Sequence, residues 1–247
     1  MKMDWINNYF DETYAKYFLE SVDEERTSSQ VAFIENVLGI SPPCEVADFC
    51  CGIGRHTIEF AKRGYLSVGY DFNDYYVNRA SQQALDCGLV SAFFFKQDMR
   101  NFQEEGLFDV ACCLWVSFGY FDDETNRDIF FRMVRSLRSG GKFFMDLENR
   151  EYILKNFIHE KWRTKDETVI LERNKFDPET SRIKCNRTII ENGTKKIYTR
   201  HVRMYTATEI IQLAKASGLQ EIKLLGDWDG KPYGLQTQRM ILTGRLP

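Results

Sequence analysis

The sequence of 247 residues predicts an α/β protein built on a doubly wound, largely parallel sheet. Between residues 45 and 146, short apolar runs alternate with stretches of helical periodicity. This order is typical of right-handed crossovers between parallel strands. In addition, residues 108–114 (FDVACCL) form an uninterrupted apolar run, as expected of a strand that is covered on both faces.

Two helices are expected ahead of the sheet, at residues 5–19 and 27–38. The second carries its apolar residues on one face, behind a cap formed by Thr27 and Ser28. Two prolines at positions 42 and 43 then break the chain.

Strands and helices alternate from there to residue 146. The strands expected in the parallel sheet are residues 46–49, 66–70, 92–96, 108–114 and 142–146. The helices expected between them are residues 56–63, 74–87 and a segment ending near residue 137. Glycines follow each helix, at Gly64, at Gly88 and at the pair Gly140 and Gly141, and support these ends.

A different pattern begins after residue 150. Residues 167–175, 182–191 and 194–204 alternate between polar and apolar side chains, and Asp-Pro and Asn-Gly turn signals join them. We expect a three-stranded antiparallel insert. A helix at 206–217 and two strands at 220–225 and 238–244, which we expect to pair as a hairpin, close the chain.

The composition is that of an ordinary soluble globular protein, which we expect in the cytoplasm. A net charge of −3 leaves no basic footprint, which argues against a nucleic-acid partner. The N-terminus is polar and aromatic, so we expect no signal peptide, and no run approaches the roughly 18 apolar residues of a membrane span. Seven cysteines without a C-x-x-C pair indicate reduced thiols rather than disulfides or zinc ligands.

The stretch EVADFCCGIGRH, residues 45–56, places Gly52 and Gly54 between a strand and a helix. Glycines let the backbone pass close to a ligand, and the start of the next helix offers free N–H groups. Dinucleotide-binding folds use the same device, but they require a third small residue where this chain has Thr57. Asp48 precedes the loop and would repel a phosphate and attract an ammonium group.

Two further acids follow neighbouring strands. Asp71 ends the second strand, where a carboxylate accepts hydrogen bonds from both hydroxyls of a ribose, and Phe72 beside it can lie against a purine. Asp98 follows the third strand, where it can accept from an exocyclic amine. The ligand that needs these three acids and no phosphate site is S-adenosylmethionine.

Five segments carry a resemblance to the class I S-adenosylmethionine-dependent methyltransferases over essentially the whole chain. They are VADFCCGIGRHTIEFAKRGY (46–65), VGYDFN (68–73), FKQDMRNF (95–102), FDVACCLWVSFGYF (108–121) and LRSGGKFFMDLEN (137–149). The family motif acid-x-Gly-x-Gly-x-Gly is matched by Asp48, Gly52 and Gly54, with Cys50 in place of the first glycine. The resemblance implies a seven-stranded Rossmann-like methyltransferase sheet.

The resemblance also implies the roles of individual residues. Gly52 and Gly54 would lie against the methionine portion of the cofactor, Asp71 would hold the ribose, and Asp98 with Met99 would read the adenine. The full set of residues expected to bind the cofactor is Tyr14, Asp48, Cys50, Gly52, Gly54, Arg55, Asp71, Phe72, Asp98, Met99, Leu114 and Trp115.

The sequence says less about the methyl acceptor than about the cofactor. The tail and the insert are similar to a bacterial subgroup that acts mostly on small molecules, including sugar-amine and peptide α-N-methyltransferases. The segment WVSFGYF (115–121) lacks the [DNS]-P-P-[YFW] signature of enzymes that methylate DNA bases or glutamine. We therefore expect a small-molecule acceptor, with nitrogen preferred over oxygen. An RNA or peptide methyltransferase and a non-catalytic cofactor-binding protein remain open.

For the acceptor side of the reaction, the candidates are aromatic or polar residues outside the cofactor motifs. The candidate catalytic residues are His201 and Tyr120, and the candidate substrate-binding residues are Tyr17, Phe118, Arg203, Trp228 and Tyr233.

We expect four parts along the chain. Residues 1–40 are N-terminal helices and a candidate lid, and residues 41–150 are the cofactor-binding core. Residues 151–205 are the insert, a candidate substrate or dimer contact, and residues 206–247 complete the core sheet. The sequence is compatible with a monomer or a homodimer.

Overall fold

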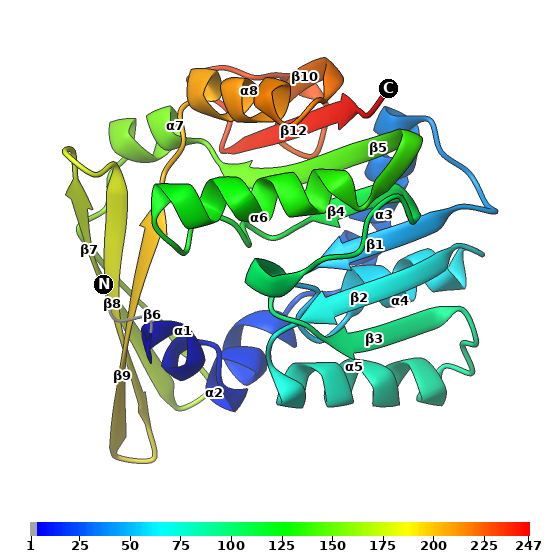
Figure 1. Cartoon of the computed structure of the whole chain (residues 1–247). Coiled ribbons are helices and arrows are strands. Elements are labelled where there is room, and N and C mark those ends of the chain that lie inside the picture. Colours follow the sequence, from blue (N-terminus) through cyan, green and yellow to red (C-terminus); the bar gives the residue numbers. More distant parts are fainter. Residues whose placement is uncertain (1–3) are drawn as a thin grey trace.

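The computed structural model describes residues 4–247, so the first three residues of the expected N-terminal part lie outside the described residues. Eight strands form one mixed sheet in the order β11-β10-β12-β5-β4-β1-β2-β3 (Figure 1). Its strands are β1 (Glu45–Phe49), β2 (Leu66–Asp71), β3 (Ala92–Lys96), β4 (Phe108–Cys113), β5 (Leu137–Glu148), β10 (Gln220–Gly226), β11 (Lys231–Pro232) and β12 (Arg239–Arg245). The five strands β5, β4, β1, β2 and β3 are parallel, and β12 is antiparallel to β5.

Helices cover both faces of this sheet, which confirms the prediction of a doubly wound α/β fold. The helices are α3 (Glu24–Leu38), α4 (Arg55–Lys62), α5 (Asp74–Asp86), α6 (Asp123–Arg135) and α8 (Ala207–Ala216). Alternate residues of β1 and β4 face opposite layers: Ala47 and Ala111 join the core under α6 and α8, and Val46 and Val110 join the core under α3 and α4. Both faces are apolar because both are covered.

The closing segment pairs as the sequence predicted. Strands β10 and β12 are antiparallel, with Leu224 opposite Leu242, and β12 continues the sheet along β5. The eighth strand, β11, has only two residues and extends the edge beside β10.

A second sheet of four antiparallel strands stands beside the core, in the order β6-β7-β8-β9. Its strands are β6 (Glu160–Lys165), β7 (Thr168–Asp177), β8 (Arg182–Glu191) and β9 (Thr194–Arg203), and the short helix α7 (Arg150–Lys155) leads into it. The sequence predicted only three of these strands. The run EKWRTK of β6 is almost wholly exposed, so it lacks the polar-apolar alternation that reveals a half-buried strand.

Helix boundaries differ from the sequence prediction at two places. Helix α3 begins at Glu24 because the Asp23 side chain accepts a hydrogen bond of 2.6 Å from the backbone nitrogen of Arg26. Helix α6 ends at Arg135, well before Gly140, and β5 already starts at Leu137.

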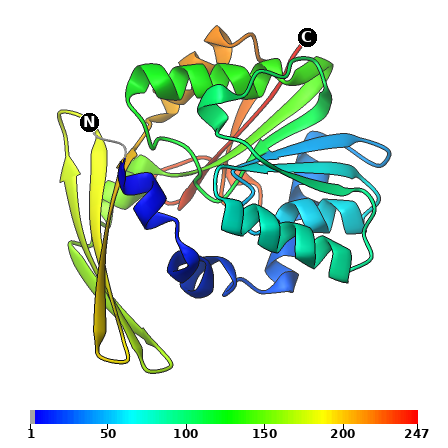
Figure 2. The same cartoon turned by 60° about the horizontal axis from the view of Figure 1, so that its bottom comes forward.

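The expected helix at residues 5–19 is divided into α1 (Asp4–Tyr9), α2 (Glu12–Tyr14) and a π-helical turn (Ala15–Leu19). Asp11 interrupts it, since its carboxylate accepts a hydrogen bond of 2.9 Å from the backbone nitrogen of Tyr14 and starts a new helix. Figure 2 shows that this N-terminal segment lies between the antiparallel sheet and the core. Tyr9 and Tyr17 pack there with Ile170, Ile189 and Tyr198 of the second sheet.

Two general features complete the fold. Within residues 4–247 no helix combines the length and apolar character needed to cross a membrane. All seven cysteines are free thiols.

Candidate functional site

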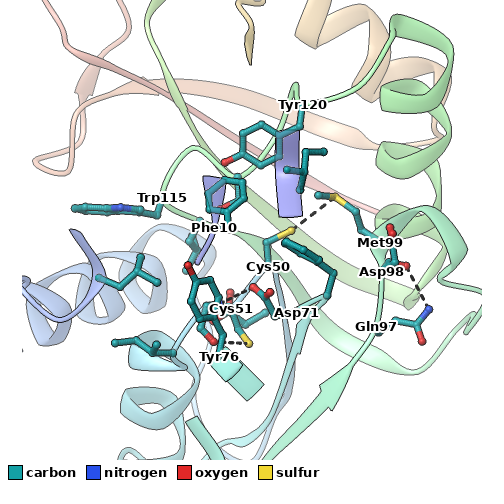
Figure 3. Close-up of a pocket in the computed structure, with 18 of the residues that line it drawn as sticks. Phe10, Cys50, Cys51, Asp71, Tyr76, Gln97, Asp98, Met99, Trp115 and Tyr120 are labelled. Atoms are coloured by element: carbon teal, nitrogen blue, oxygen red, sulfur yellow. Dashed lines mark hydrogen bonds between the residues drawn. The ribbon is translucent and has the colours of Figure 1, made fainter. Parts of the chain in front are cut away.

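A cavity of about 300 Å³ opens where β1, β2 and β4 end, below the N-terminal segment (Figure 3). This is the position at which open α/β sheets bind their ligands. Of the residues that the sequence predicts to bind the cofactor, those that line the cavity are Tyr14, Asp48, Cys50, Gly52, Arg55, Asp71, Phe72, Asp98, Met99, Leu114 and Trp115.

The loop after β1 has a left-handed backbone at three alternate positions, Cys50 (φ 60°), Gly52 (φ 58°) and Gly54 (φ 78°). Cys50 adopts the conformation that the glycine of the family motif would adopt more easily. Gly54 caps α4 and does not line the cavity. A Cβ atom at Gly54 would lie 2.6 Å from the Phe94 ring, so only glycine fits there.

Asp71 is buried at the end of β2 and is oriented by the backbone. Its carboxylate accepts hydrogen bonds from the nitrogen of Gly52 (2.9 Å) and the nitrogen of Asn73 (3.0 Å). Burial raises the pKa of Asp71 to about 6, because the hydrogen bonds only partly offset the loss of hydration. At neutral pH the carboxyl group is therefore mostly ionised. Its remaining lone pairs can accept hydrogen bonds from a ligand in the cavity.

Asp48 is almost completely buried beneath the same loop. Its carboxylate accepts a hydrogen bond of 2.8 Å from the hydroxyl of Thr57. Burial raises the pKa of Asp48 to about 7, against the opposing effects of Thr57 and Arg55. A cation in the cavity would stabilise the ionised form of this carboxyl group.

Asp98 differs from the other two acids because it already has a cationic partner. Its carboxylate forms an ion pair of 2.5 Å with the guanidinium of Arg100 and caps the 3-10 turn Met99–Asn101. Partial burial favours the neutral acid, but the hydrogen bonds from Arg100 prevail and lower the pKa of Asp98. The side chain is thus charged and can accept a further hydrogen bond from a ligand.

Aromatic side chains form the roof of the cavity. The ring of Phe10 lies 5.4 Å from that of Tyr120, 6.3 Å from that of Phe72 and 5.1 Å from that of Tyr14, measured between centroids. The amide of Asn73 donates a hydrogen bond of 2.5 Å to the carbonyl oxygen of Phe10. The N-terminal segment is therefore held on the core over the cavity.

The two candidate catalytic residues lie in different places. Tyr120 lines the cavity, and its hydroxyl donates a hydrogen bond of 3.0 Å to the carbonyl oxygen of Val116. Burial raises its pKa well above the ordinary value, so the phenol remains protonated. His201 lies on β9 outside the cavity, where its ring packs 6.3 Å from that of Trp5, and burial lowers its pKa.

The five candidate substrate residues do not line the cavity, and each has other partners. The hydroxyl of Tyr17 binds Thr168 (2.8 Å) and Glu191 (2.7 Å). Phe118 is buried in the core, where its ring centroid lies 5.4 Å from that of Tyr205.

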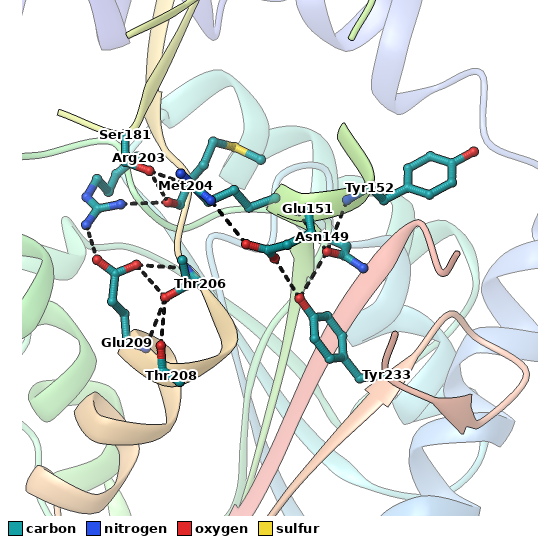
Figure 4. Close-up of polar contacts among 11 residues, drawn as sticks. Asn149, Glu151, Tyr152, Ser181, Arg203, Met204, Thr206, Thr208, Glu209 and Tyr233 are labelled. Atoms are coloured by element: carbon teal, nitrogen blue, oxygen red, sulfur yellow. Dashed lines mark hydrogen bonds and ion pairs between the residues drawn. The ribbon is translucent and has the colours of Figure 1, made fainter. Parts of the chain in front are cut away.

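The other three make contacts outside the cavity lining. Arg203 forms an ion pair of 2.5 Å with Glu209 at the start of α8, and the hydroxyl of Tyr233 donates to Glu151 at 2.8 Å (Figure 4). Trp228 stacks beneath the sheet, 5.6 Å from the ring of Phe144. The sequence prediction selected these residues because they are aromatic or polar. It could not show whether their side chains point into the cavity.

The sequence did not single out several residues that line the cavity. They are Ile6, Asn7, Phe10, Leu19, Cys51, Ile53, His56, Tyr76, Gln97, Arg100, Ser117 and Phe121. A usable signal existed for Phe10, which is four residues before Tyr14 and so shares its face on a helix. Tyr76 carried no such signal: its hydroxyl reaches the carbonyl oxygen of Asp11 (3.0 Å) only because the chain folds back.

Part of the core is similar to proteins that are already known. Residues 46–141 match the model of a family described as a methyltransferase domain. A protein of Geobacillus sp. (strain WCH70) that is named a methyltransferase is 24% identical over 142 residues, which cover 56% of this chain and 57% of that protein. The chain thus spans just over half the length of that relative. Methyltransferase YqeM of Bacillus subtilis (strain 168) is 24% identical over 207 residues, covering 79% of this chain and 81% of the relative.

Solved structures show the same fold over the whole chain. An S-adenosylmethionine-dependent methyltransferase from Clostridium acetobutylicum ATCC 824 superposes with a TM-score of 0.81 at 18% identity, covering 98% of this chain and 99% of that one. The sugar N-methyltransferase KedS8 from Streptoalloteichus sp. ATCC 53650 superposes with a TM-score of 0.68 at 18% identity, covering 89% and 87%.

Proposed function

We propose that this chain, whose residues 46–141 match a methyltransferase domain, is a class I S-adenosylmethionine-dependent methyltransferase that transfers a methyl group to a nitrogen of a small organic acceptor. The observation that carries the proposal is the cavity itself. Its volume is about 300 Å³, it has three carboxyl groups at three strand ends, and the aromatic rings of Phe10, Tyr14 and Tyr120 cover it.

The residues of the cavity fit S-adenosylmethionine in chemical type. Asp71 offers a carboxylate for the two ribose hydroxyls, and Asp98 offers one for the exocyclic amine of adenine. Asp48 lies beneath the glycine loop, where its negative charge would attract the ammonium group of the cofactor. The cofactor supplies a methyl group on a positively charged sulfur. A pyrophosphate group is disfavoured at this loop, because the carboxyl groups of Asp48 and Asp71 lie beside it and would repel negative charge.

The chain contributes alignment and exclusion of water. The aromatic walls hold two reactants in line and limit the access of water; they are the buried Tyr120 and the partly buried Phe10 and Phe72. Orientation of this kind can contribute about 7–11 kcal/mol to a bimolecular reaction. The Tyr120 phenol is protonated and already donates to Val116, so we assign it a positioning role rather than that of a base.

A small acceptor follows from the enclosure of the site. The N-terminal segment packs over the cavity and against the antiparallel sheet, so a macromolecule would have to displace it. The name of the similar sugar N-methyltransferase KedS8 supports nitrogen as the acceptor atom.

The test is a transfer assay with cofactor labelled in its methyl group. A metabolite extract, an RNA pool and a peptide pool are incubated separately with the enzyme and with an Asp71→Asn variant. We expect label in an amine of the metabolite extract, and far less with the variant. Label found only in RNA or only in peptide would reject the proposal, and so would cofactor binding with no transfer to any pool.

A further inference from the structure

Three arginines gather around a single tryptophan at one end of the cavity. The guanidinium carbons lie 4.6 Å (Arg55), 5.0 Å (Arg26) and 5.8 Å (Arg239) from the centroid of the Trp115 ring. They come from three separate elements: Arg26 from α3, Arg55 from the first turn of α4 and Arg239 from the start of β12. We call this set the Trp115 arginine cluster.

The backbone at the centre of the cluster is strained. Trp115 and Val116 both have a φ of 60°, in the left-handed region. For a β-branched residue such as Val116 this conformation is a true outlier, and such strain concentrates at binding and catalytic sites. A hydrogen bond of 3.2 Å from the Val116 nitrogen to the carbonyl oxygen of Asp146 holds the turn in place.

The cluster carries more positive than negative charge. Asp146, fully buried, lies 3.6 Å from Arg239, measured from carboxylate Oδ2 to Nη1, which is an ion pair but too long for a hydrogen bond. Within residues 4–247 no carboxylate forms an ion pair with Arg26 or Arg55. Burial, together with Arg26 and Arg239, lowers the pKa of Arg55 to about 10, although Asp48 and Asp146 oppose this.

Hydrogen-bonding capacity at this place is also unused. Nη2 of Arg55 and Nη1 of Arg239 are buried and have no hydrogen-bond partner within the described part of the chain. Both carboxylate oxygens of the neighbouring Asp146 are also buried without a hydrogen bond from the described residues, so the ion pair with Arg239 completes the hydrogen bonds of neither group. A buried donor without a partner costs about 1–3 kcal/mol, so the donors of Arg55 and Arg239 can still take a further acceptor. Arg55 and Trp115 line the cavity, and the exposed Arg26 borders solvent, so the cluster joins the cavity to the surface.

From these observations we propose that Arg26 and Arg239, which both lie beside Trp115, bind a carboxylate of the methyl acceptor, so that the substrate is an anionic amine. This inference rests on the proposed function. Arg55 lies beside the glycine loop and is the nearest cation for the cofactor's own carboxylate. Arg239 lies on β12, which β5 and β4 separate from β1, and Arg26 lies on α3. These two arginines are therefore available for a second anion.

The probe for this site is acetate, with acetamide as its uncharged analogue of equal shape. The protein is saturated with S-adenosylhomocysteine, and tryptophan fluorescence is titrated at constant ionic strength. We expect a saturable change with acetate, none with acetamide, and loss of the signal in Trp115→Phe. Arg239→Gln and Arg26→Gln should weaken acetate binding at least tenfold and leave the affinity for S-adenosylhomocysteine within twofold.

The variants are chosen so that misfolding cannot imitate the expected result. Arg239→Gln removes a cation that faces buried Asp146, whereas Arg26 is exposed and its replacement disturbs no ion pair. Arg245→Gln, on the same strand as Arg239 but in an exposed pair with Glu221, is the matched control and should behave as the wild type.

Three results would overturn the inference: no saturable acetate signal, equal affinity for acetamide, or a tenfold loss of S-adenosylhomocysteine affinity in both variants. The last result would assign the cluster to the cofactor's carboxylate. Failure of the proposed function is separate, since it would appear in the transfer assay, as label only in RNA or peptide or as cofactor binding without transfer, and not in the acetate titration.

Discussion

The carboxylate of Asp71 accepts a hydrogen bond of 2.9 Å from the backbone nitrogen of Gly52. This bond joins the end of β2 to the loop after β1, so one side chain both shapes the glycine loop and faces the cavity. The same group that we assign to the ribose therefore also holds the loop that we assign to the methionine portion.

Replacement of Asp71 by asparagine should weaken binding of S-adenosylhomocysteine about 100-fold. The neutral amide oxygen is a weaker hydrogen-bond acceptor for the ribose hydroxyls than the carboxylate is. The amide NH2 group also faces one of the two backbone N–H donors. Each hydrogen bond to a charged group contributes about 1.5–3 kcal/mol. Calorimetric titration measures the loss. Asp74→Asn, at an exposed position three residues later, is the control and should leave the affinity unchanged. Equal affinities for wild type and Asp71→Asn would contradict the assignment.

Asp98 should be the residue that distinguishes adenine from hypoxanthine. Its charged carboxylate accepts from an exocyclic amine but is repelled by the oxygen that replaces this amine in S-inosylhomocysteine. We expect wild type to bind S-adenosylhomocysteine at least tenfold more tightly than the inosine analogue, and Asp98→Asn to lose that preference. Competition binding of the two ligands measures it, with the exposed Asp122→Asn as control. Retained discrimination in Asp98→Asn would mean that adenine is read elsewhere.

A comparison of Gly54 with Gly88 separates the cost of a clashing Cβ atom from the cost of a left-handed backbone. Both Gly54 and Gly88 have a positive φ, but a Cβ atom at Gly54 would meet Phe94 and Ala80, whereas nothing lies within 4 Å at Gly88. Gly88→Ala should cost about 1 kcal/mol of unfolding free energy, and Gly54→Ala about 2–4 kcal/mol. Urea unfolding measures both, and equal costs would show that Phe94 moves aside.

Asp48 should make the ligand-free protein less stable as the pH rises. Its pKa in the folded state is raised from 3.8 to about 7, so the folded state binds this proton more tightly than the unfolded state does. The corresponding stability is present at low pH and is lost as the pH rises through about 7. Between pH 5 and pH 8 the loss should be about 2–3 kcal/mol, since one pH unit corresponds to about 1.4 kcal/mol.

The Asp48→Asn variant provides the comparison, because its amide can still accept the hydrogen bond from Thr57 and cannot ionise. Urea unfolding at pH 5, 6.5 and 8 should show a smaller decline for the variant than for wild type. Parallel curves would mean that Asp48 is ionised throughout this range.

A buried ion pair between β7 and β8 should stabilise the antiparallel sheet, and its arginine also contacts the N-terminal segment. Arg187 forms a 2.6 Å pair with Glu172, both side chains being nearly buried, and lies 3.8 Å from the centroid of the Phe18 ring. Arg187→Gln should lower the free energy of unfolding by about 3 kcal/mol, because the buried carboxylate of Glu172 loses its closest partner. Arg173→Gln, in a pair with Glu160 that is exposed on both sides, should cost less than about 1 kcal/mol. Similar costs for the two variants would contradict this view.

Much of the core could be predicted from the sequence. The uninterrupted apolar run at 108–114 and the glycines Gly64 and Gly88 after α4 and α5 reflect local chemistry, since strands covered on both faces must be apolar and chain reversals favour glycine. The pair Gly140 and Gly141 was a wrong helix end, because both lie within β5. The acids Asp48, Asp71 and Asp98 could be placed at one edge because the carboxyl ends of parallel strands meet there. All three line the cavity.

The acceptor side could not be predicted in the same way. His201, Arg203, Trp228 and Tyr233 are aromatic or polar residues near the insert and the tail, but none of them lines the cavity. Instead, the roof is formed by Phe10 and Tyr14, which precede the first strand, β1, by more than thirty residues in the chain. No periodicity relates these residues to the strand ends that they cover.

The sequence by itself determined the parallel sheet, its glycine loop and the three acids at the edge, because each depends on neighbours within one strand-loop-helix unit. Only the tertiary structure decided which side chains close the cavity and which charges meet at Trp115. Arg26, Arg55 and Arg239 are brought together by the packing of α3, α4 and β12. Contacts between distant segments depend on the packing of the whole fold and leave no local pattern in the sequence.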